Sequence, residues 1–421
     1  MVLDSQRPAR TALQGFRPMG GRAPARQQSI RRHNLALLLA EIERSGPLSR
    51  AELARRIGLT KATVSSMVDA LRSAELLEDR APPLTGAARG RPGSPVGFAA
   101  HAPVAIGIEI AVDYLSACVV DLDGTVRRSV RRVQDHRRGD PTRHLERAVE
   151  CAGSLLTRAP NCLVGLGLAV PGVIGDRGRV RAAPNLPAFV GHELGAELSA
   201  AVQGFAAHGP GALAIEIGNE ANLAALAELW YGGHRDLRDF VLVSGEIGVG
   251  AGVVADGRLF AGAGGAAGEL GHVTVDPNGP GCACGSSGCL ERYVGQDVLL
   301  SRLGFTRREQ LVDALGSRDP ATSKVLEEAG HALGVATAAL LNVVDVPAVV
   351  LGGLYAELAP ALEAGLRAEL ERRVVAHLWR PTEIVVASLG ASAAMRGAAG
   401  VVLQRFFADP VAFVPALVAT E

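Results

Sequence analysis

The sequence predicts an α/β protein with a winged helix-turn-helix domain at its N-terminus. Beyond residue 99, short apolar runs typical of buried strands alternate with longer amphipathic helical stretches. Glycine-rich loops follow several of these strands, at the sheet edge where ligands bind in α/β folds. Before residue 99, three helical stretches with a glycine turn precede an extended segment rich in proline and glycine. With 421 residues, the chain is long enough for two or three domains.

The formal net charge of zero hides an uneven distribution along the chain. Residues 1–95 contain 16 Lys or Arg against 8 Asp or Glu, a surplus of eight positive charges that the remaining residues balance. The N-terminal part is therefore the candidate for binding a polyanion. Residues 1–28 are rich in Arg, Pro, Gly and Gln without an apolar period, which predicts a disordered basic arm. This arm either adds nonspecific DNA affinity or is an inert tail.

Nothing in the sequence indicates secretion or insertion into a membrane. The N-terminus lacks the continuous apolar segment of a signal peptide, and no apolar run reaches transmembrane length. We therefore expect a cytoplasmic protein with no membrane partner. In that reducing compartment Cys118, Cys151 and Cys162, each among apolar neighbours, are predicted to be buried as small hydrophobic residues.

Residues 29–98 have the pattern of a winged helix-turn-helix domain. A first helix is expected to begin at Ser29 and to end at Ser45-Gly46-Pro47. A capping box from Ser49 to Glu52 begins the second helix, Gly58 provides the turn, and Thr60 caps the third helix. The predicted buried face consists of Ile30, Leu35, Leu38, Leu39 and Ile42 on the first helix, and Val64, Met67, Val68 and Leu71 on the third.

The third helix carries small hydroxyl side chains and one lysine near its N-terminus, which suits a recognition helix in the major groove. The segment Arg89-Gly90-Arg91-Pro92 is expected at the tip of the wing, where it either enters the minor groove or contacts phosphates only. An ordinary three-helix protein-binding module is the alternative interpretation. The candidate DNA contacts are Arg50, Lys61, Thr63, Ser65, Ser66, Arg89, Gly90 and Arg91.

The stretch from Gly268 to Glu291 combines three cysteines and a histidine in a glycine-rich loop. Cys282, Cys284 and Cys289 fall within eight residues, and His272 lies ten residues before the first of them. Three thiolates and one imidazole match a closed tetrahedral zinc site, which leaves no open position and would be structural. A buried cysteine cluster, or a disulfide with a spare thiol, is the alternative.

Together these motifs resemble the ROK family, which groups bacterial sugar-responsive repressors with sugar kinases on a two-lobed actin-like ATPase (ribonuclease H-like) fold. The resemblance covers nearly everything from Ser29 onward. It is carried by the helix-turn-helix pattern, the run AGGAAGELGH from Ala263 to His272, the cysteine run, Asn219-Glu220 and Gly352-Gly353. It implies a first lobe of residues 99–217 plus 391–421. Residues 218–390 would form a second lobe with the zinc loop and a dimerisation surface.

The resemblance also assigns roles to individual residues. It implies zinc ligands at His272, Cys282, Cys284 and Cys289, and sugar contacts at Asn219, Glu220, Glu269, His272 and Glu291. Carboxylates and an amide can pair with the adjacent hydroxyls of a pyranose, which supports the sugar assignment. His272 would turn one ring nitrogen to the metal and the other to the sugar. Ordinary solvated acids are the alternative for Glu269 and Glu291.

Both phosphate-binding loops of the family's kinases are altered in this chain. The first, Asp-x-Gly-Gly-Thr in the kinases, is replaced by the run from Glu109 to Asp113, and the second, Gly-Thr-Gly, by Gly245-Glu246-Ile247-Gly248. Side chains and negative charge thus stand where a phosphate cradle would lie. Glu220 also takes the place of the catalytic Asp. We therefore expect neither ATP binding nor enzymatic activity.

These observations predict a transcriptional regulator, with repression as its default action. Its affinity for a palindromic operator in double-stranded DNA would change when a sugar binds in a non-catalytic kinase-like cleft. A homodimer is expected, with a tetramer as the other possibility. The alternatives are an ATP-dependent sugar kinase with a DNA-binding appendage and an interaction protein scaffolded by zinc. The identity and the phosphorylation state of the sugar stay open.

Overall fold

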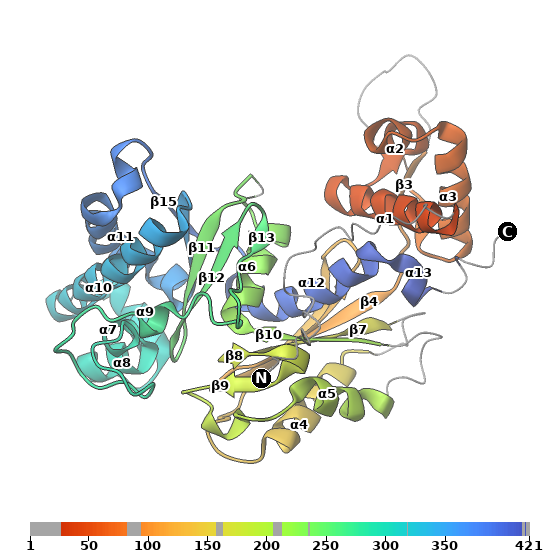
Figure 1. Cartoon of the computed structure of the whole chain (residues 1–421). Coiled ribbons are helices and arrows are strands. Elements are labelled where there is room, and N and C mark those ends of the chain that lie inside the picture. The colour runs from red at the N-terminus through yellow and green to blue at the C-terminus, as the bar shows by residue number, and fades with distance from the viewer. Residues whose placement is uncertain are drawn as a thin grey trace, which may run out of the picture.

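The computed structural model describes residues 27–81, 94–156, 163–204, 213–234, 236–317, 319–414 and 417. Figure 1 shows a small helical domain at one end, followed by two lobes that each contain a twisted sheet. The predicted basic arm lies outside the described residues except for its last two positions. The predicted wing tip at residues 89–91 and Cys162 also lie outside them. No helix in the described ranges combines the length and the apolarity needed to span a membrane.

The N-terminal domain is a winged helix-turn-helix, as predicted. It consists of α1 (Gln27–Ser45), β1 (Leu48–Ser49), α2 (Arg50–Ile57), α3 (Lys61–Ser73), β2 (Leu77–Asp79) and β3 (Pro95–Phe98). The strands form a small antiparallel sheet in the order β1-β3-β2. Gly58 adopts a left-handed φ of 71° at the end of α2, which gives the tight turn into α3 at no Cβ cost.

The predicted helix caps are present, with one difference. The Ser49 and Thr60 hydroxyls accept the Glu52 and Thr63 backbone N–H groups, each at 3.2 Å. The capping box is incomplete, because the Glu52 carboxylate pairs with Arg55 and Arg56 and not with the backbone of Ser49.

The buried face predicted for α1 and α3 is confirmed except at its first position. The prediction for Ile30 was wrong, since Ile30 is 50% exposed in the first turn of α1. The shared core of the domain begins one helical turn later, at Leu35. Cys118 and Cys151 are buried free thiols, as expected.

The first lobe contains a five-stranded sheet in the order β10-β7-β4-β5-β6. Its strands are β4 (Val104–Ile110), β5 (Tyr114–Asp121), β6 (Val126–Val133), β7 (Leu163–Val170) and β10 (Ala214–Asn219). β4, β5 and β6 form an antiparallel meander, whereas β4, β7 and β10 run parallel. α4 (Pro141–Gly153) and α5 (Leu194–Ala201) cover one face, and α12 (Ala393–Ala408) covers the other (Figure 1).

The second lobe repeats this topology. Its sheet has the order β13-β12-β11-β14-β15, built from β11 (Phe240–Gly245), β12 (Val249–Ala255), β13 (Arg258–Leu259), β14 (Ala348–Gly353) and β15 (Glu383–Val386). Again three antiparallel strands are followed by two parallel ones. α6 (Glu220–Tyr231) packs on one face, and the pair α10 (Pro320–Val344) and α11 (Leu354–Arg373) packs on the other. Two lobes with the same strand order confirm the predicted two-lobed architecture.

Shorter elements connect these units. They are β8 (Val173–Ile174), β9 (Val180–Ala182), α7 (Glu291–Val294), α8 (Gln296–Leu303), α9 (Arg308–Ser317) and α13 (Pro410–Phe413). Single 3₁₀ turns occur at η1 (Asp176–Gly178), η2 (Pro187–Phe189), η3 (Val202–Gly204), η5 (Leu270–His272), η6 (Val375–Leu378) and η7 (Gly390–Ser392).

Helix α12 connects the interior of the molecule with the winged domain (Figure 1). Its first half packs tightly on α6, where a side chain at Gly397 would collide with the Leu223 carbonyl. Its second half carries Phe407, whose ring centroid lies 5.9 Å from that of Phe98 in β3. The residues around Phe407 and the core of the winged domain form one continuous hydrophobic cluster. The winged domain and the first lobe therefore share a core, and are not joined by a linker alone.

Candidate functional site

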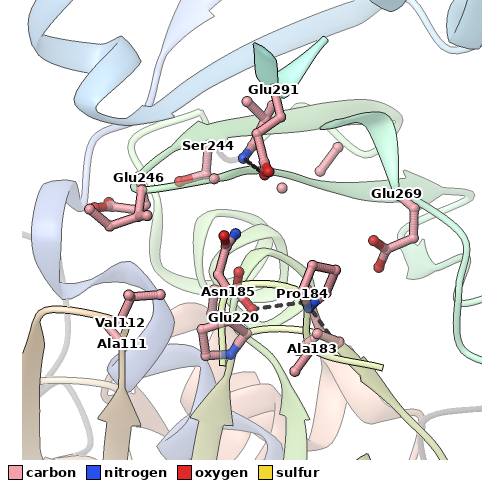
Figure 2. Close-up of a pocket in the computed structure, with 18 of the residues that line it drawn as sticks. Ala111, Val112, Ala183, Pro184, Asn185, Glu220, Ser244, Glu246, Glu269 and Glu291 are labelled. Carbon is pink, nitrogen blue, oxygen red and sulfur yellow. Dashed lines mark hydrogen bonds between the residues drawn. The ribbon is translucent and has the colours of Figure 1, made fainter. Parts of the chain in front are cut away.

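A cleft between the two lobes is the main candidate site. Its walls are formed largely by residues that follow the carboxyl ends of β4, β7, β10 and β11, the edge where ligands bind in α/β sheets. All five residues predicted to contact a sugar line this one cleft: Asn219, Glu220, Glu269, His272 and Glu291. Figure 2 shows Glu220, which directly follows β10, with Glu291 opposite it and Glu269 to one side. The structure thus brings together residues that are up to 72 positions apart in the sequence.

Asn219 and Glu220 lie at the junction of β10 and α6. The Asn219 side chain caps α6 by accepting the Asn222 N–H at 3.0 Å, and its amide donates to the Glu220 carboxylate at 2.8 Å and to the Gly172 carbonyl at 3.2 Å. These three bonds fix the amide relative to Glu220. Burial raises the pKa of Glu220 well above its usual range, and the nearby carboxylate of Glu269 raises it further.

Glu291 and Glu269 face the cleft from the second lobe. The Glu291 carboxylate accepts the backbone N–H of Val249 at 3.2 Å. A side chain at Gly248 would collide with this carboxylate, so the glycine permits its close approach to β12. Burial raises the pKa of Glu269, and Glu291 adds to the effect while His272 opposes it. Both acids are half-buried and line the cleft.

Asn185 is a cleft residue that the sequence analysis missed. It belongs to the loop Ala183-Pro184-Asn185 that follows β9, and it lines the cleft beside Glu220 (Figure 2). A side chain at Gly248 would also collide with its amide, so Asn185 reaches across to the second lobe. A single polar residue between Pro184 and Pro187, in a loop after a strand, was the available indication in the sequence.

The predicted zinc ligands also converge. The ligand atoms of His272, Cys282, Cys284 and Cys289 all lie within 4.8 Å of one another. The Cys284 and Cys289 sulfurs are 3.6 Å apart, and the Cys282 sulfur lies 3.7 Å from His272 Nδ1. Two sulfurs bound to one tetrahedral zinc would lie about 3.8 Å apart, so the Cys284–Cys289 separation and the donor types are compatible with this ion. The cysteines are free thiols, which removes the disulfide alternative for this loop.

The two loops expected to replace the kinases' phosphate loops each carry a carboxylate that other side chains engage. The buried Glu109 carboxylate accepts the Tyr114 hydroxyl at 2.7 Å and the Ser116 hydroxyl at 2.9 Å. In the second loop, Glu246 accepts a hydrogen bond from Arg308 at 3.2 Å. Burial raises the pKa of Glu246 to about 7, and the Arg308 guanidinium opposes this shift. Two acidic residues thus occupy the end of the cleft that faces β14.

Comparison with known proteins identifies the lobes. The model of the ROK family matches residues 105–405, most of the chain. The chain belongs to the ROK family. A second model, that of the MarR family, matches residues 36–86, which covers most of the helix-turn-helix.

Individual relatives of this ROK protein include repressors. The chain is 30% identical over 396 residues to the xylose repressor of Bacillus spizizenii, covering 91% of this chain and 98% of that protein. It is 25% identical over 355 residues to the DNA-binding transcriptional dual regulator NagC of Escherichia coli, covering 80% and 84%. The match to the xylose repressor thus extends over nearly the whole chain.

Solved structures confirm the fold. A ROK family transcriptional regulator described as a homologue of the Escherichia coli MLC protein superposes with a TM-score of 0.74 at 23% identity, covering 93% of this chain and 100% of that one. A ROK family glucokinase from Streptomyces griseus, solved with glucose and AMPPNP, superposes with a TM-score of 0.62 at 23% identity, covering 70% and 98%. The superposition on the glucokinase thus leaves out about a third of this ROK chain. The superposition on the transcriptional regulator covers nearly all of it.

The candidate DNA contacts of this ROK protein differ in their availability. Lys61, Thr63 and Ser66 are exposed on α3, and Ser65 is half-buried. The Thr63 hydroxyl lies 2.9 Å from that of Thr60, so it takes part in the helix cap. Arg50 donates to Asp69 at 2.8 Å, which leaves its guanidinium partly neutralised. Arg89, Gly90 and Arg91 lie outside the described residues.

Proposed function

We propose that this ROK protein is a DNA-binding transcriptional repressor whose operator affinity is controlled by a sugar in the cleft between its lobes. The observation that carries this proposal is the convergence of Asn219, Glu220, Glu269, His272 and Glu291 in one cleft of a chain that also has a winged helix-turn-helix. Repressor relatives support it, one of them over 91% of the chain. We assign the DNA-binding unit to residues 29–98, with lobes at residues 99–217 plus 391–421 and 218–390.

The cleft offers the groups that hydroxyl recognition requires. Carboxylates of Glu269 and Glu291 accept hydrogen bonds from sugar hydroxyls, and the amide of Asn185 adds a donor. A zinc ion held by His272, Cys282, Cys284 and Cys289 would supply a fixed structural centre behind these groups. Because His272 both belongs to the ligand cluster and lines the cleft, it joins the two sites.

The rival function, a sugar kinase, is disfavoured by three features of the cleft. Glu109 and Glu246 place side chains in the loops expected to replace the kinases' phosphate loops, where they would block the approach of a phosphate to the backbone. The Glu220 carboxylate accepts a hydrogen bond from the Asn219 amide at 2.8 Å, so one of its oxygens is already engaged and is not available to an attacking hydroxyl. The backbone N–H of Glu246 donates to the Gly248 carbonyl at 2.9 Å, so this loop amide is already engaged. We therefore propose that the cleft binds sugar without ATP and without catalysis.

The effect of a sugar in the cleft would reach the winged domain through α6 and α12. Glu220 is the first residue of α6, which packs on α12, and α12 reaches the core of the winged domain at Phe407. A sugar that draws the lobes together would shift this helix pair and thereby the winged domain. We expect a homodimer, formed through the second lobe, that reads two half-sites at fixed spacing, so a small reorientation would lower operator affinity.

The test is operator binding in the presence of sugars. A DNA duplex selected by the full-length protein from a random library serves as the probe, and its affinity is measured by fluorescence anisotropy with and without a panel of monosaccharides. We expect at least one sugar to weaken binding, and the double variant Glu269→Gln, Glu291→Gln to keep DNA affinity while losing the response. Indifference to every sugar would overturn the effector claim.

Two further measurements test the DNA-binding surface and the kinase alternative. Lys61→Ala is expected to weaken DNA binding roughly uniformly across sequences, whereas Lys324→Ala, on α10 in the second lobe, should leave it unchanged. Titration with ATP and an assay for ADP release test the kinase alternative. Sugar-dependent ADP release would favour the kinase over our proposal.

A further inference from the structure

We propose that the first lobe carries a second ligand site, a hollow beside α4 that binds a small molecule with a phosphate group. The hollow has a volume of about 490 Å³, which is within the range of ligand pockets. It is lined by the segment between β6 and α4 and by the first two turns of α4, and it shares no lining residue with the cleft. The site depends neither on sugar binding nor on DNA binding, so it can be tested independently of both.

Three arginines line the hollow. Arg138 lies in the segment before α4, and Arg143 and Arg147 are four residues apart on one face of this helix. Within the described part of the chain, none of the three guanidinium groups pairs with a carboxylate. The neighbouring Arg137, in contrast, pairs with Asp297 of the second lobe. The hollow therefore gathers three positive charges whose hydrogen-bond donors are unused by the described residues.

Two acids also line the hollow, but the backbone of their own loop engages both. The Asp140 carboxylate caps α4 by accepting the Thr142 N–H at 3.1 Å. The Asp135 carboxylate accepts the Arg137 N–H at 3.0 Å. Three guanidinium groups thus face two carboxylates with existing partners, and an anionic ligand would meet a surplus of positive charge.

The number of guanidinium groups favours a phosphate over a carboxylate. Each guanidinium presents its N–H donors in a planar fork that matches two oxygens of an anion. A phosphate monoester has three terminal oxygens and close to two negative charges, so it can engage several forks at once. A carboxylate has two oxygens and one charge, and one fork occupies it. The positive end of the α4 dipole, which borders the hollow, adds to the preference for an anion.

The loop that carries Arg138 is held against α4 by the buried His144. The His144 Nδ1 accepts the Gln134 side-chain amide at 3.2 Å, and its Nε2–H donates to the Arg138 carbonyl at 2.9 Å. Gly139 adopts a left-handed φ of 109°, and a side chain there would approach Nε2 of His144 to 2.9 Å. Glycine thus permits the turn to lie against the imidazole. The backbone that positions Arg138 is fixed before a ligand binds, which lowers the entropic cost of binding.

The same segment contacts the cleft on its other side. The Gln134 N–H donates to the Asp113 carbonyl at 3.0 Å, and the His136 N–H donates to the Val112 carbonyl at 2.8 Å. The His136 Nδ1–H donates to the Ala111 carbonyl at 2.7 Å. Ala111, Val112 and Asp113 line the cleft, and Figure 2 labels the first two. A ligand in the hollow would therefore stabilise the segment that supports this cleft loop.

The hollow lies apart from the DNA-binding domain. α4 covers the face of the first lobe's sheet opposite to α12, and α12 is the helix that shares a core with the winged domain (Figure 1). DNA held by α3 would thus approach the protein on the other side of this sheet. A small molecule fits the hollow better than the phosphates of such DNA.

Calorimetry with simple phosphates tests the site. The full-length protein, in a phosphate-free buffer, is titrated with inorganic phosphate, glycerol 3-phosphate, glycerol and acetate. We expect both phosphates to bind, glycerol not to bind, and acetate to bind at least about tenfold more weakly than glycerol 3-phosphate. Absence of binding by both phosphates up to about 10 mM would overturn the inference.

Substitutions in α4 make the test specific to the hollow. Arg143→Gln and Arg147→Gln each remove charge-assisted hydrogen bonds, and each should weaken the binding of glycerol 3-phosphate about tenfold. Both side chains are exposed, so we expect the variants to fold. Arg258→Gln, at an exposed position of β13 in the second lobe, is the matched control and should bind as the wild type does. Unchanged phosphate affinity in both α4 variants would place the phosphate elsewhere and refute the site. Loss of DNA affinity in both would assign these arginines to DNA instead.

Hydrogen exchange tests the connection between the hollow and the cleft. The backbone amides of Gln134 and His136 bond to the cleft loop, so their exchange should slow when glycerol 3-phosphate binds to the wild type and not when it is added to Arg143→Gln at the same concentration. Exchange that phosphate leaves unchanged in the wild type would contradict the connection to the cleft, even if calorimetry supports the site.

Discussion

Cys284 is the exposed member of the cluster formed by His272 and three cysteines. Replacing it with Ser leaves three of the four donors, and we expect the variant to lose bound zinc and thermal stability. Because His272 also lines the cleft, the sugar response should weaken as well. Metal content and sugar-dependent release of DNA are the two measurements.

The control for Cys284→Ser is Cys151→Ala, which changes a cysteine buried in α4 far from the cluster in sequence. This control should retain zinc and the sugar response, whatever it does to stability. A Cys284→Ser protein that lacks zinc yet responds normally to sugar would break the proposed connection between metal and effector.

Glu369 on α11 is a buried carboxylate whose protonation in acid should lower the stability of the protein. It is 7% exposed and accepts hydrogen bonds from Arg372 at 2.6 Å and from His331 at 3.1 Å. Burial opposes ionisation, yet these partners and Arg373 lower the pKa of Glu369 from 4.5 to about 2. Since the folded pKa lies below the unfolded one, this stabilisation is present above about pH 4.5 and is lost as the pH falls toward 2.

Glu369→Gln should therefore lower stability at pH 7 by about 1 to 3 kcal/mol and flatten the pH dependence between pH 4.5 and 2. Thermal unfolding across this pH range is the measurement. Glu363→Gln, which removes an exposed pair with Arg367 on the same helix, is the control and should cost about 0.5 kcal/mol or less. Equal effects of the two substitutions would show that burial of Glu369 contributes nothing.

At the residue scale, cleft residues that belong to motifs could be predicted from the sequence, whereas isolated cleft residues could not. Glu220, Glu269 and His272 belong to recurring motifs with fixed spacing, so their convergence could be predicted. Asn185 could not, because it enters the cleft from a loop whose path depends on the contact with Gly248 in the other lobe. Ile30 was misplaced because periodicity identifies a face of a helix but not where its packing partners begin.

At the scale of elements, α12 carries the contact between the lobes and the winged domain. We predict that Phe407→Ala lowers stability by about 3 to 5 kcal/mol, because it opens a cavity between Phe98 and Phe406. The same change should reduce the effect of sugar on DNA affinity, since the shared core would no longer hold the winged domain. Thermal unfolding and anisotropy with and without sugar are the measurements.

Arg32→Ala is the matched control for Phe407→Ala. It removes an exposed ion pair with Asp409 at the same junction, and such pairs contribute about 0.2 to 1 kcal/mol. If the two substitutions have equal effects on the sugar response, then the aromatic core around Phe407 does not transmit the effect of sugar to the winged domain.

The strands and helices were largely predictable, whereas the path of α12 was not. Apolar runs identify strands such as β4 and β7 because both faces of these strands are buried. The return of α12 to the first lobe depends on contacts between backbones distant in sequence. A side chain at Gly107 would collide with the Met395 carbonyl, and one at Gly397 with the Leu223 carbonyl. No local propensity encodes such contacts, so only the family resemblance indicated the return.

At the scale of the whole molecule, two contacts close the cleft from opposite lobes. Arg181 of β9 donates to the Gly264 carbonyl at 3.2 Å, and Arg137 lies 3.3 Å from Asp297 of α8. Both contacts join the first lobe to the second, so they stabilise a closed arrangement of the lobes. A sugar bound by residues of both lobes would favour the same arrangement, and by linkage the contacts should raise sugar affinity.

The Arg137–Asp297 pair gives the last prediction. Exposed pairs contribute about 0.2 to 1 kcal/mol, so Arg137→Ala or Asp297→Ala should weaken sugar binding by about 1.4-fold to fivefold. The double variant Arg137→Asp, Asp297→Arg should restore affinity, and the wild-type advantage over Arg137→Ala should shrink in 1 M salt. Arg302→Ala, which removes a pair with Glu328 inside the second lobe, is the control and should leave sugar affinity unchanged. Calorimetry at two salt concentrations measures the sugar affinity of the wild type and of these four variants. If the swapped pair binds sugar no better than Arg137→Ala, the effect of Arg137 does not pass through Asp297, and closure must then depend on the Arg181 contact and on the sugar itself.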